Sequence, residues 1–229
     1  MVLSFLPLAL AALLFVGGHF GLSSALVRDR LVGRVGERWF RAGFAVYAAA
    51  CLIWMVLAYA ATPQVVLWSE PAWSRWLALL GMPVALILVV GGARPDNPTA
   101  SSWSPGINQP EVDGIFAITR HPMMWGIGLF AIMHIPANGN LASLILFGSL
   151  TVLAWGGTMA IDARKRRLSP ALWGWLAPAT SNLPLFALVT GRTHLRPFRL
   201  ATPAAIAFLA FVALLALHRL VLGVSPFPY

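Results

Sequence analysis

Charge is scarce in this sequence. Only 10% of its 229 residues are charged, whereas 59% are hydrophobic, and the mean hydropathy is +0.78. These values lie far outside the usual balance of soluble globular domains and exclude that class. The sequence therefore predicts a membrane protein whose main partner is membrane lipid.

Cysteine is almost absent as well, because Cys51 is the single cysteine and lies inside an apolar run. One cysteine forms no disulfide within the chain and supplies no cysteine-based metal site. We interpret Cys51 as a small buried hydrophobic residue. Any metal or cofactor would therefore be held by other side chains.

Six stretches are apolar over roughly the 20 residues that a membrane-spanning helix needs. They are residues 3–26, 41–62, 74–92, 120–137, 141–161 and 201–223. The sequence thus predicts an all-α, polytopic membrane helical bundle with about six transmembrane helices. We see no repeat and no domain boundary, and we expect one domain over residues 1–229.

Proline and glycine mark helix ends and connections. Pro122 disfavours helical dihedrals at His121, so the fourth helix should begin near His121 or kink there. The turn signal at 138–140 predicts a tight antiparallel hairpin between the fourth and fifth helices. The segment 168–190 contains three prolines and suits an interfacial or re-entrant piece, and 93–118 is typical of an ordered or lid-like loop.

Basic residues are concentrated in alternate connections. Of the 16 Lys and Arg residues, 14 follow the first, third and fifth spans, and only Arg75 and Arg219 lie near the other side. By the positive-inside rule, the basic connections are cytoplasmic and both termini periplasmic, in a bacterial inner membrane. The formal charge of +9 therefore indicates topology and requires no nucleic-acid partner.

Four of the five histidines lie within or at the ends of predicted spans, where ionisable groups indicate function. These are His19, His121, His134 and His218; His194 lies in a basic connection and needs no special role. Counting residues inward from the basic connections gives each histidine's depth in the membrane. His19 and His121 lie toward the cytoplasmic side, and His134 and His218 lie toward the outer side. On one helix, His121 and His134 would be roughly 20 Å apart, so they are not opposite ligands of one cofactor.

Several motifs resemble the NnrU family of bacterial integral membrane proteins over nearly the whole chain. They are GGHFGLSSALVRDRLVGRVGERWFR at 17–41, TRHPMMWG at 119–126, AIMHIPANGNLASLILFG at 131–148, and HRLVLG-x-SPFP from His218. The family is associated with nitrite and nitric oxide metabolism in denitrifying bacteria. The resemblance therefore implies a redox setting without specifying a reaction.

The same motifs are similar to those of the 15-cis-zeta-carotene isomerases, membrane enzymes that use haem b. The resemblance implies haem b bound through His19 and His134, the positions that match the proposed ligands of the isomerases. Those enzymes carry a cysteine three residues before the second histidine, where this chain has Ala131. His121 and His218 stand as alternative ligands.

A second resemblance centres on Arg120, His121 and Pro122, followed by Trp125 and Gly126. It is similar to the C-terminal motif of isoprenylcysteine and phospholipid methyltransferases and their sterol-reductase relatives. This likeness implies that Arg120 and His121 bind S-adenosylmethionine or NADPH. Those families place a pair of glutamates after the next span, where this chain has the single carboxylate of Asp162.

We therefore expect a haem b protein, either an isomerase or a redox component of nitrite and nitric oxide metabolism. Its partner would be a hydrophobic small molecule or nitric oxide. The alternatives are a transferase or reductase of the Arg-His-Pro type and a non-catalytic membrane assembly partner. The oligomeric state does not follow from the sequence.

Overall fold

The computed structural model describes residues 2–100 and 112–227. Its long helices are α1 (Val2–Ser23), α3 (Glu37–Ala61), α4 (Ala72–Gly92), α6 (Pro122–Asn138), α7 (Leu141–Leu168) and α10 (Ala201–Leu222). The short ones are α2 (Ala25–Val35), α5 (Ile115–Ile118), α8 (Pro170–Ala179), α9 (Phe186–Val189) and the 3-10 helix η1 (Pro197–Leu200). These described residues contain no strand, which confirms the predicted all-α class.

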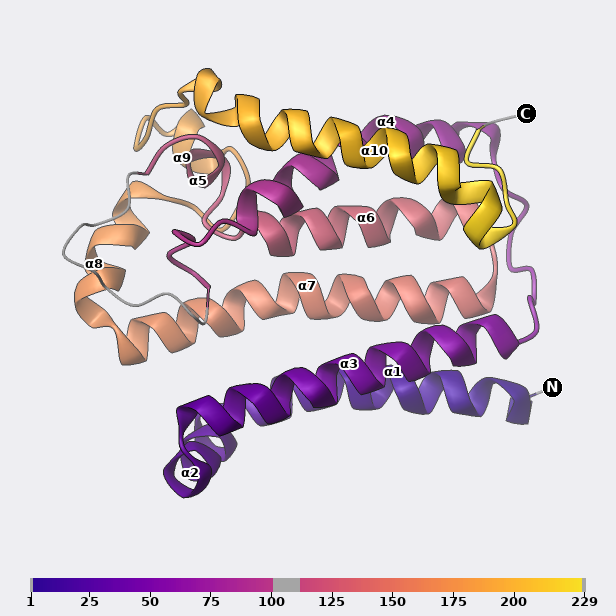
Figure 1. The fold of residues 1–229 in the computed structure, drawn as a ribbon, viewed down its shortest axis with the longest axis horizontal. Coiled ribbons are helices and arrows are strands. Elements are labelled where there is room, and N and C mark those ends of the chain that lie inside the picture. The colour runs from indigo at the N-terminus through magenta and orange to yellow at the C-terminus, as the bar shows by residue number, and fades with distance from the viewer. Residues whose placement is uncertain (1, 101–111, 228–229) are drawn as a thin grey trace.

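The long helices form a bundle in which each packs on the next in the order α3, α1, α7, α6, α4 and α10 (Figure 1). Small side chains allow close approach between α1, α3 and α7, among them Ala11, Ala58 and Ala142, each at most 6% exposed. Bulky apolar residues such as Leu80, Leu209 and Leu220 point outward instead. Small residues inside and large apolar residues outside are typical of helices surrounded by lipid.

Five helices are long and apolar enough to cross a membrane, within the described ranges. They are Leu3–Ser23, Glu37–Ala61, Ala72–Gly92, Leu141–Leu168 and Pro197–Leu222. The remaining long helix, α6, has 17 residues and packs between α4 and α7. That length is about 25 Å, at the lower limit for a span. A multi-pass membrane bundle is therefore confirmed, and the expected number of about six is approximate.

The helix boundaries differ from the apolar stretches most in three places. The first stretch was expected to run to residue 26, but α1 ends at Ser23 and α2 begins at Ala25. Helix α3 begins at Glu37, four residues before its apolar stretch, and α7 continues seven residues past its stretch to Leu168. Hydropathy locates the apolar part of a helix, whereas charged residues such as Glu, Arg and Lys continue the helix into water.

The hairpin between α6 and α7 has the predicted form. Gly139 ends α6 with φ +62, and the Asn140 side chain accepts a hydrogen bond from the Ser143 backbone N–H to cap α7. A Cβ at position 139 would collide with the Trp68 carbonyl. Glycine is therefore required both by the positive φ and by the close approach of the connection between α3 and α4, which contains Trp68.

The bundle has two distinct ends, and α6, like the other long helices, runs from one to the other (Figure 1). We call the end that carries α2, α5, α8 and α9 the basic end, because the 14 basic residues of the alternate connections lie there (Figure 1). The opposite end carries the turn at Gly139, the beginning of α1 and the end of α10. The segment 168–190 forms only the short helices α8 and α9, so the prediction that it makes no spanning helix is confirmed. Within the predicted 93–118 loop, residues 101–111 lie outside the described residues.

Candidate functional site

A cluster of three ionisable side chains is buried at the basic end, where α6 begins beside α7. The Asp162 carboxylate accepts hydrogen bonds from Arg120 Nε, at 2.9 and 3.1 Å, and from His121 Nε2, at 2.7 Å. The Asp162 and Arg120 side chains are each 11% exposed, and that of His121 is fully buried. An ion pair removed from water to this extent persists only when its partners are hydrogen-bonded, and here they are.

The local sequence positions His121 for this contact. Thr119 is extended, and Pro122 occupies the first turn of α6, so His121 adopts the non-helical φ of −119 at the helix N-cap. The Arg120 backbone N–H donates to the Ser181 carbonyl at 2.9 Å, and the Thr119 hydroxyl donates to the Asn182 carbonyl at 2.7 Å. The segment before α6 is thus fixed to the segment after α8, and the predicted helix start at His121 is confirmed.

One polar atom of the cluster has no hydrogen-bond partner among the described residues: His121 Nδ1, which is buried. Because Nε2 faces the Asp162 carboxylate, a ring proton lies on Nε2, and Nδ1 presents a lone pair when the imidazole is neutral. Burial lowers the pKa of His121 below its ordinary value, although the hydrogen bond to Asp162 acts in the opposite direction. The cluster therefore offers a buried acceptor oriented by a carboxylate.

Residues that the sequence did not single out as site residues surround this cluster. The Arg120 guanidinium carbon lies 5.1 Å from the centre of the Trp173 ring, and the Arg166 guanidinium carbon lies 5.2 Å from it. Asn182 accepts a hydrogen bond from Trp125 Nε1 and donates one to the Thr158 hydroxyl, so it connects α6 to α7. Trp173 and Asn182 lie in a proline-broken segment without helical periodicity, which gives no signal of their contacts with α6 and α7.

The other candidate histidines satisfy one ring nitrogen locally. Nδ1 of His19 bonds to the Phe15 carbonyl at 2.6 Å, Nδ1 of His134 to the Phe130 carbonyl at 2.7 Å, and Nδ1 of His218 to the Val224 carbonyl at 2.9 Å. Each Nδ1 therefore carries the proton, which leaves the lone pair on Nε2. A metal-binding histidine commonly has this arrangement, since its other ring nitrogen donates to a carbonyl or carboxylate.

The structure does not bring His19 and His134 together. Their positions can be compared along α7. Phe20, which follows His19, lies against Gly156, because a Cβ on Gly156 would touch its ring. The His134 ring lies 5.1 Å from the ring of Phe147. Phe147 and Gly156 are nine residues apart on α7, a distance of about 14 Å. His19 and His121 lie at the basic end, and His134 and His218 lie at the opposite end, as the sequence predicts (Figure 1).

His134 and His218 both lie at that opposite end (Figure 1). Each lies four residues before the end of its helix, α6 or α10. The His134 ring also packs on Phe130, with ring centres 4.4 Å apart. His194 is exposed at the basic end. No group of three or more His, Cys, Asp or Glu side chains is placed to hold a metal ion in the described part of the chain.

Comparison with known proteins identifies the family. The family model described as NnrU protein matches residues 7–226. No curated protein and no solved structure matches the chain. Because the match covers nearly the whole sequence, this multi-pass membrane protein belongs to the NnrU family.

Proposed function

We propose that this protein is a membrane transferase or reductase of the Arg-His-Pro type, with its working site at Arg120, His121 and Asp162. The observation that carries the proposal is the buried Nδ1 of His121, which lacks a partner among the described residues while Asp162 holds Nε2. A buried polar group without a partner is costly, and such groups occur at sites where a ligand completes the hydrogen bonding.

The chemistry of the cluster suits the cofactors that the motif implies. The ammonium group of S-adenosylmethionine and the carboxamide of NADPH both provide N–H donors, and either would satisfy the Nδ1 acceptor. Bound there, the first would supply a methyl group and the second a hydride. Arg120 is engaged by Asp162, so its role is to balance the carboxylate charge and to hold it against His121.

The test is titration of each cofactor into the detergent-purified protein, followed by calorimetry. We expect one of the two to bind, and the His121→Ala variant to bind it about tenfold more weakly or worse, because a buried hydrogen bond to a charged or polar group is lost. His194→Ala is the matched control, since His194 is exposed at the same end. His121→Gln, which keeps a polar side chain, replaces His121→Ala if that variant does not fold.

Either of two results would overturn the proposal. One is that neither cofactor binds the folded wild-type protein at millimolar concentration. The other is that His121→Ala binds as tightly as wild type.

We propose haem b binding as the second candidate, because the histidines at the opposite end have the donor arrangement of haem ligands. The His134 ring packs beside two phenylalanine rings, and His218 lies at the same end of the bundle (Figure 1). The pair of His19 and His134 is the less favoured assignment, since Gly156 and Phe147, the α7 residues beside Phe20 and His134, are about 14 Å apart. His134 and His218 would therefore hold the iron, and the haem would supply the redox chemistry for polyene isomerisation or for nitric oxide metabolism.

A visible absorption spectrum of the purified protein, oxidised and reduced, tests this second candidate. A b-type spectrum that is lost in His134→Ala and in His218→Ala, but kept in His19→Ala, would support the assignment. Absence of haem from protein produced with ample iron and haem precursor would overturn it.

We further propose that the basic end faces the cytoplasm of a bacterial inner membrane. The concentration of 14 basic residues at this end supports the orientation. An alkaline phosphatase fused after Tyr229 should be active, because this enzyme matures only in the periplasm, whereas an inactive but stable fusion would reverse the orientation.

A further inference from the structure

A charged pocket of about 260 Å³ opens at the basic end, apart from the Arg120 cluster. Among the described residues, its lining consists of Arg94, Asp96, Asp113, Phe116 and Arg199. Arg94 follows the end of α4 and Arg199 lies in η1, just before α10, and these two long helices pack on each other. Both arginines therefore stand just beyond the apolar part of neighbouring helices, at the depth where lipid headgroups lie.

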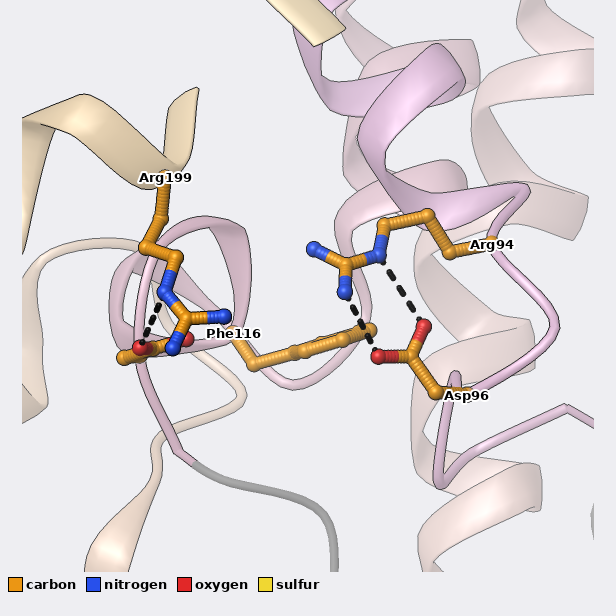
Figure 2. A pocket seen from close by; sticks show the side chains of 5 residues that line it. Arg94, Asp96, Phe116 and Arg199 are labelled. Atoms are coloured by element: carbon orange, nitrogen blue, oxygen red, sulfur yellow. Dashed lines mark hydrogen bonds and ion pairs between the residues drawn. The ribbon is translucent and has the colours of Figure 1, made fainter. Parts of the chain in front are cut away.

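The two guanidinium groups face a common space. Figure 2 shows them on either side of the Phe116 side chain, with one nitrogen of Arg94 turned away from its carboxylate partner. Arg94 binds Asp96 through Nε at 3.0 Å and Nη2 at 2.7 Å. Arg199 Nε lies 3.3 Å from Asp113 Oδ2, which accepts no hydrogen bond from the described residues.

These contacts orient the two arginines without burying them, since their side chains are 38% and 41% exposed. Two planar guanidinium groups on opposite sides of one space match the oxygens of a phosphate group better than those of a smaller anion. The nearby carboxylates disfavour a ligand of high negative charge. A phosphodiester, which carries a single negative charge, suits this pocket.

A separate apolar groove of about 210 Å³ lies along α4 and α10, toward the middle of the bundle. It is lined by Met82, Ala85, Leu86, Val89, Gly126, Ile127, Phe130 and Leu214, from α4, α6 and α10. Val89 is five residues before Arg94, so the groove begins about 8 Å from the charged pocket along the axis of α4. An anion-binding pocket above an apolar groove has the polarity profile of a phospholipid.

We propose that the charged pocket and the groove together bind one phospholipid, with its phosphodiester between Arg94 and Arg199 and an acyl chain between α4, α6 and α10. The apolar groove alone would accept any hydrocarbon, and the charged pocket alone would accept free phosphate. The charged pocket lies just beyond the ends of α4 and α10, two helices that line the groove, and this placement selects a molecule that has both parts. This site does not depend on cofactor binding at His121.

The test is native mass spectrometry of the delipidated full-length protein with three probes. Dioctanoyl phosphatidylglycerol has the phosphodiester and the chains, dioctanoylglycerol has the chains only, and inorganic phosphate has the anion only. We expect phosphatidylglycerol to bind at least about tenfold more tightly than either of the other two, because each lacks one set of contacts.

Two matched pairs of variants locate the ligand. The Arg94→Gln, Arg199→Gln double variant should lose about tenfold or more in affinity for phosphatidylglycerol. The Arg38→Gln, Arg192→Gln double variant removes the same charge from exposed positions at the same end and should bind like wild type. Leu214→Trp should fill the groove and weaken binding, whereas Leu217→Trp, on the same helix but outside the groove, should not.

Each contrary result overturns a stated part of the proposal. Equal losses in both arginine variants would mean diffuse attraction rather than a site. If inorganic phosphate binds as tightly as phosphatidylglycerol, the ligand is a soluble phosphate. If dioctanoylglycerol binds as tightly as phosphatidylglycerol, the headgroup makes no contact that contributes to affinity. If Leu214→Trp binds like wild type while the Arg94→Gln, Arg199→Gln double variant binds more weakly, the acyl chain does not lie in the groove.

Discussion

The Arg120, His121 and Asp162 cluster at the basic end and the two histidines at the opposite end satisfy their polar side chains in opposite ways. At the basic end, Asp162 on α7 accepts from Arg120 and His121, which precede α6, so the hydrogen bonds join different helices. At the opposite end, His134 bonds to a carbonyl of its own helix, and His218 bonds to the Val224 carbonyl just after its own.

This difference separates two kinds of polar group in a membrane protein. Groups that bond across helices depend on one another, because loss of one leaves a buried charge or lone pair on another element. Groups that bond within their own helix keep those bonds when a neighbouring helix changes. The cluster of Arg120, His121 and Asp162 should therefore be sensitive to substitution, and the histidines of the opposite end should be tolerant unless a ligand engages them.

The largest effect should come from Asp162→Ala. Removal of this carboxylate leaves the Arg120 charge buried without its partner, and we expect a loss of about 3–5 kcal/mol in the free energy of unfolding. Denaturant unfolding in detergent micelles measures this loss. Asp96→Ala is the control, because its pair with Arg94 is 48% exposed on the Asp96 side and should contribute less than about 1 kcal/mol. Equal losses in the two variants would contradict the distinction between buried and exposed pairs.

At the opposite end, the backbone at Gly139 should be more sensitive than the His134 imidazole. Gly139→Ala forces a Cβ onto a residue with φ +62 and against the Trp68 carbonyl, so we expect a loss of about 1–3 kcal/mol. Gly223→Ala is a matched control, since Gly223 has φ +75 but no atom within 4 Å of the added Cβ. Thermal unfolding should separate the two, with Gly139→Ala the less stable variant. If Gly223→Ala were the less stable variant, the turn at Gly139 would have to shift to accommodate the added Cβ without loss of stability.

His134→Phe should have a smaller effect on stability. The imidazole makes its hydrogen bond within α6 and otherwise packs on Phe130 and Phe147, so a phenyl ring replaces most of its contacts. We expect a change of less than about 1.5 kcal/mol in the free energy of unfolding, as for other swaps of similar volume. A loss as large as that of Asp162→Ala would indicate that His134 bonds across the bundle and that the two ends are alike.

Much of this fold was predictable from the sequence, for identifiable reasons. Apolar length gave the long helices, and Pro122 gave the start of α6. The Arg-His-Pro motif also indicated Asp162 as the carboxylate associated with it. Counting depth from the connections placed His19 and His134 at different ends, which is where they lie.

Other features left no such signal. Helix α2 has only six apolar residues among its 11, and charged residues interrupt them, so hydropathy does not predict this helix. Trp173 and Asn182 reach the cluster only because the chain folds back after α7, and periodicity carries no information about that path. The pocket at Arg94 and Arg199 joins residues more than 100 positions apart, so it depends on the packing of α4 against α10.

The smallest effect should come from Asp29→Asn, which forms a direct comparison with Asp162. Both aspartates pair with arginine, and Arg167 lies only five residues after Asp162 on α7. The Asp29 pair is exposed on both sides, 47% for Asp29 and 43% for Arg167, and its hydrogen bond lowers the pKa of Asp29 below its ordinary value. Water and salt screen such a pair, so we expect no measurable change in unfolding temperature for Asp29→Asn at 0.15 M salt. A clear loss would mean that α2 is held on α7 by this contact, and burial would then not be what distinguishes the two pairs.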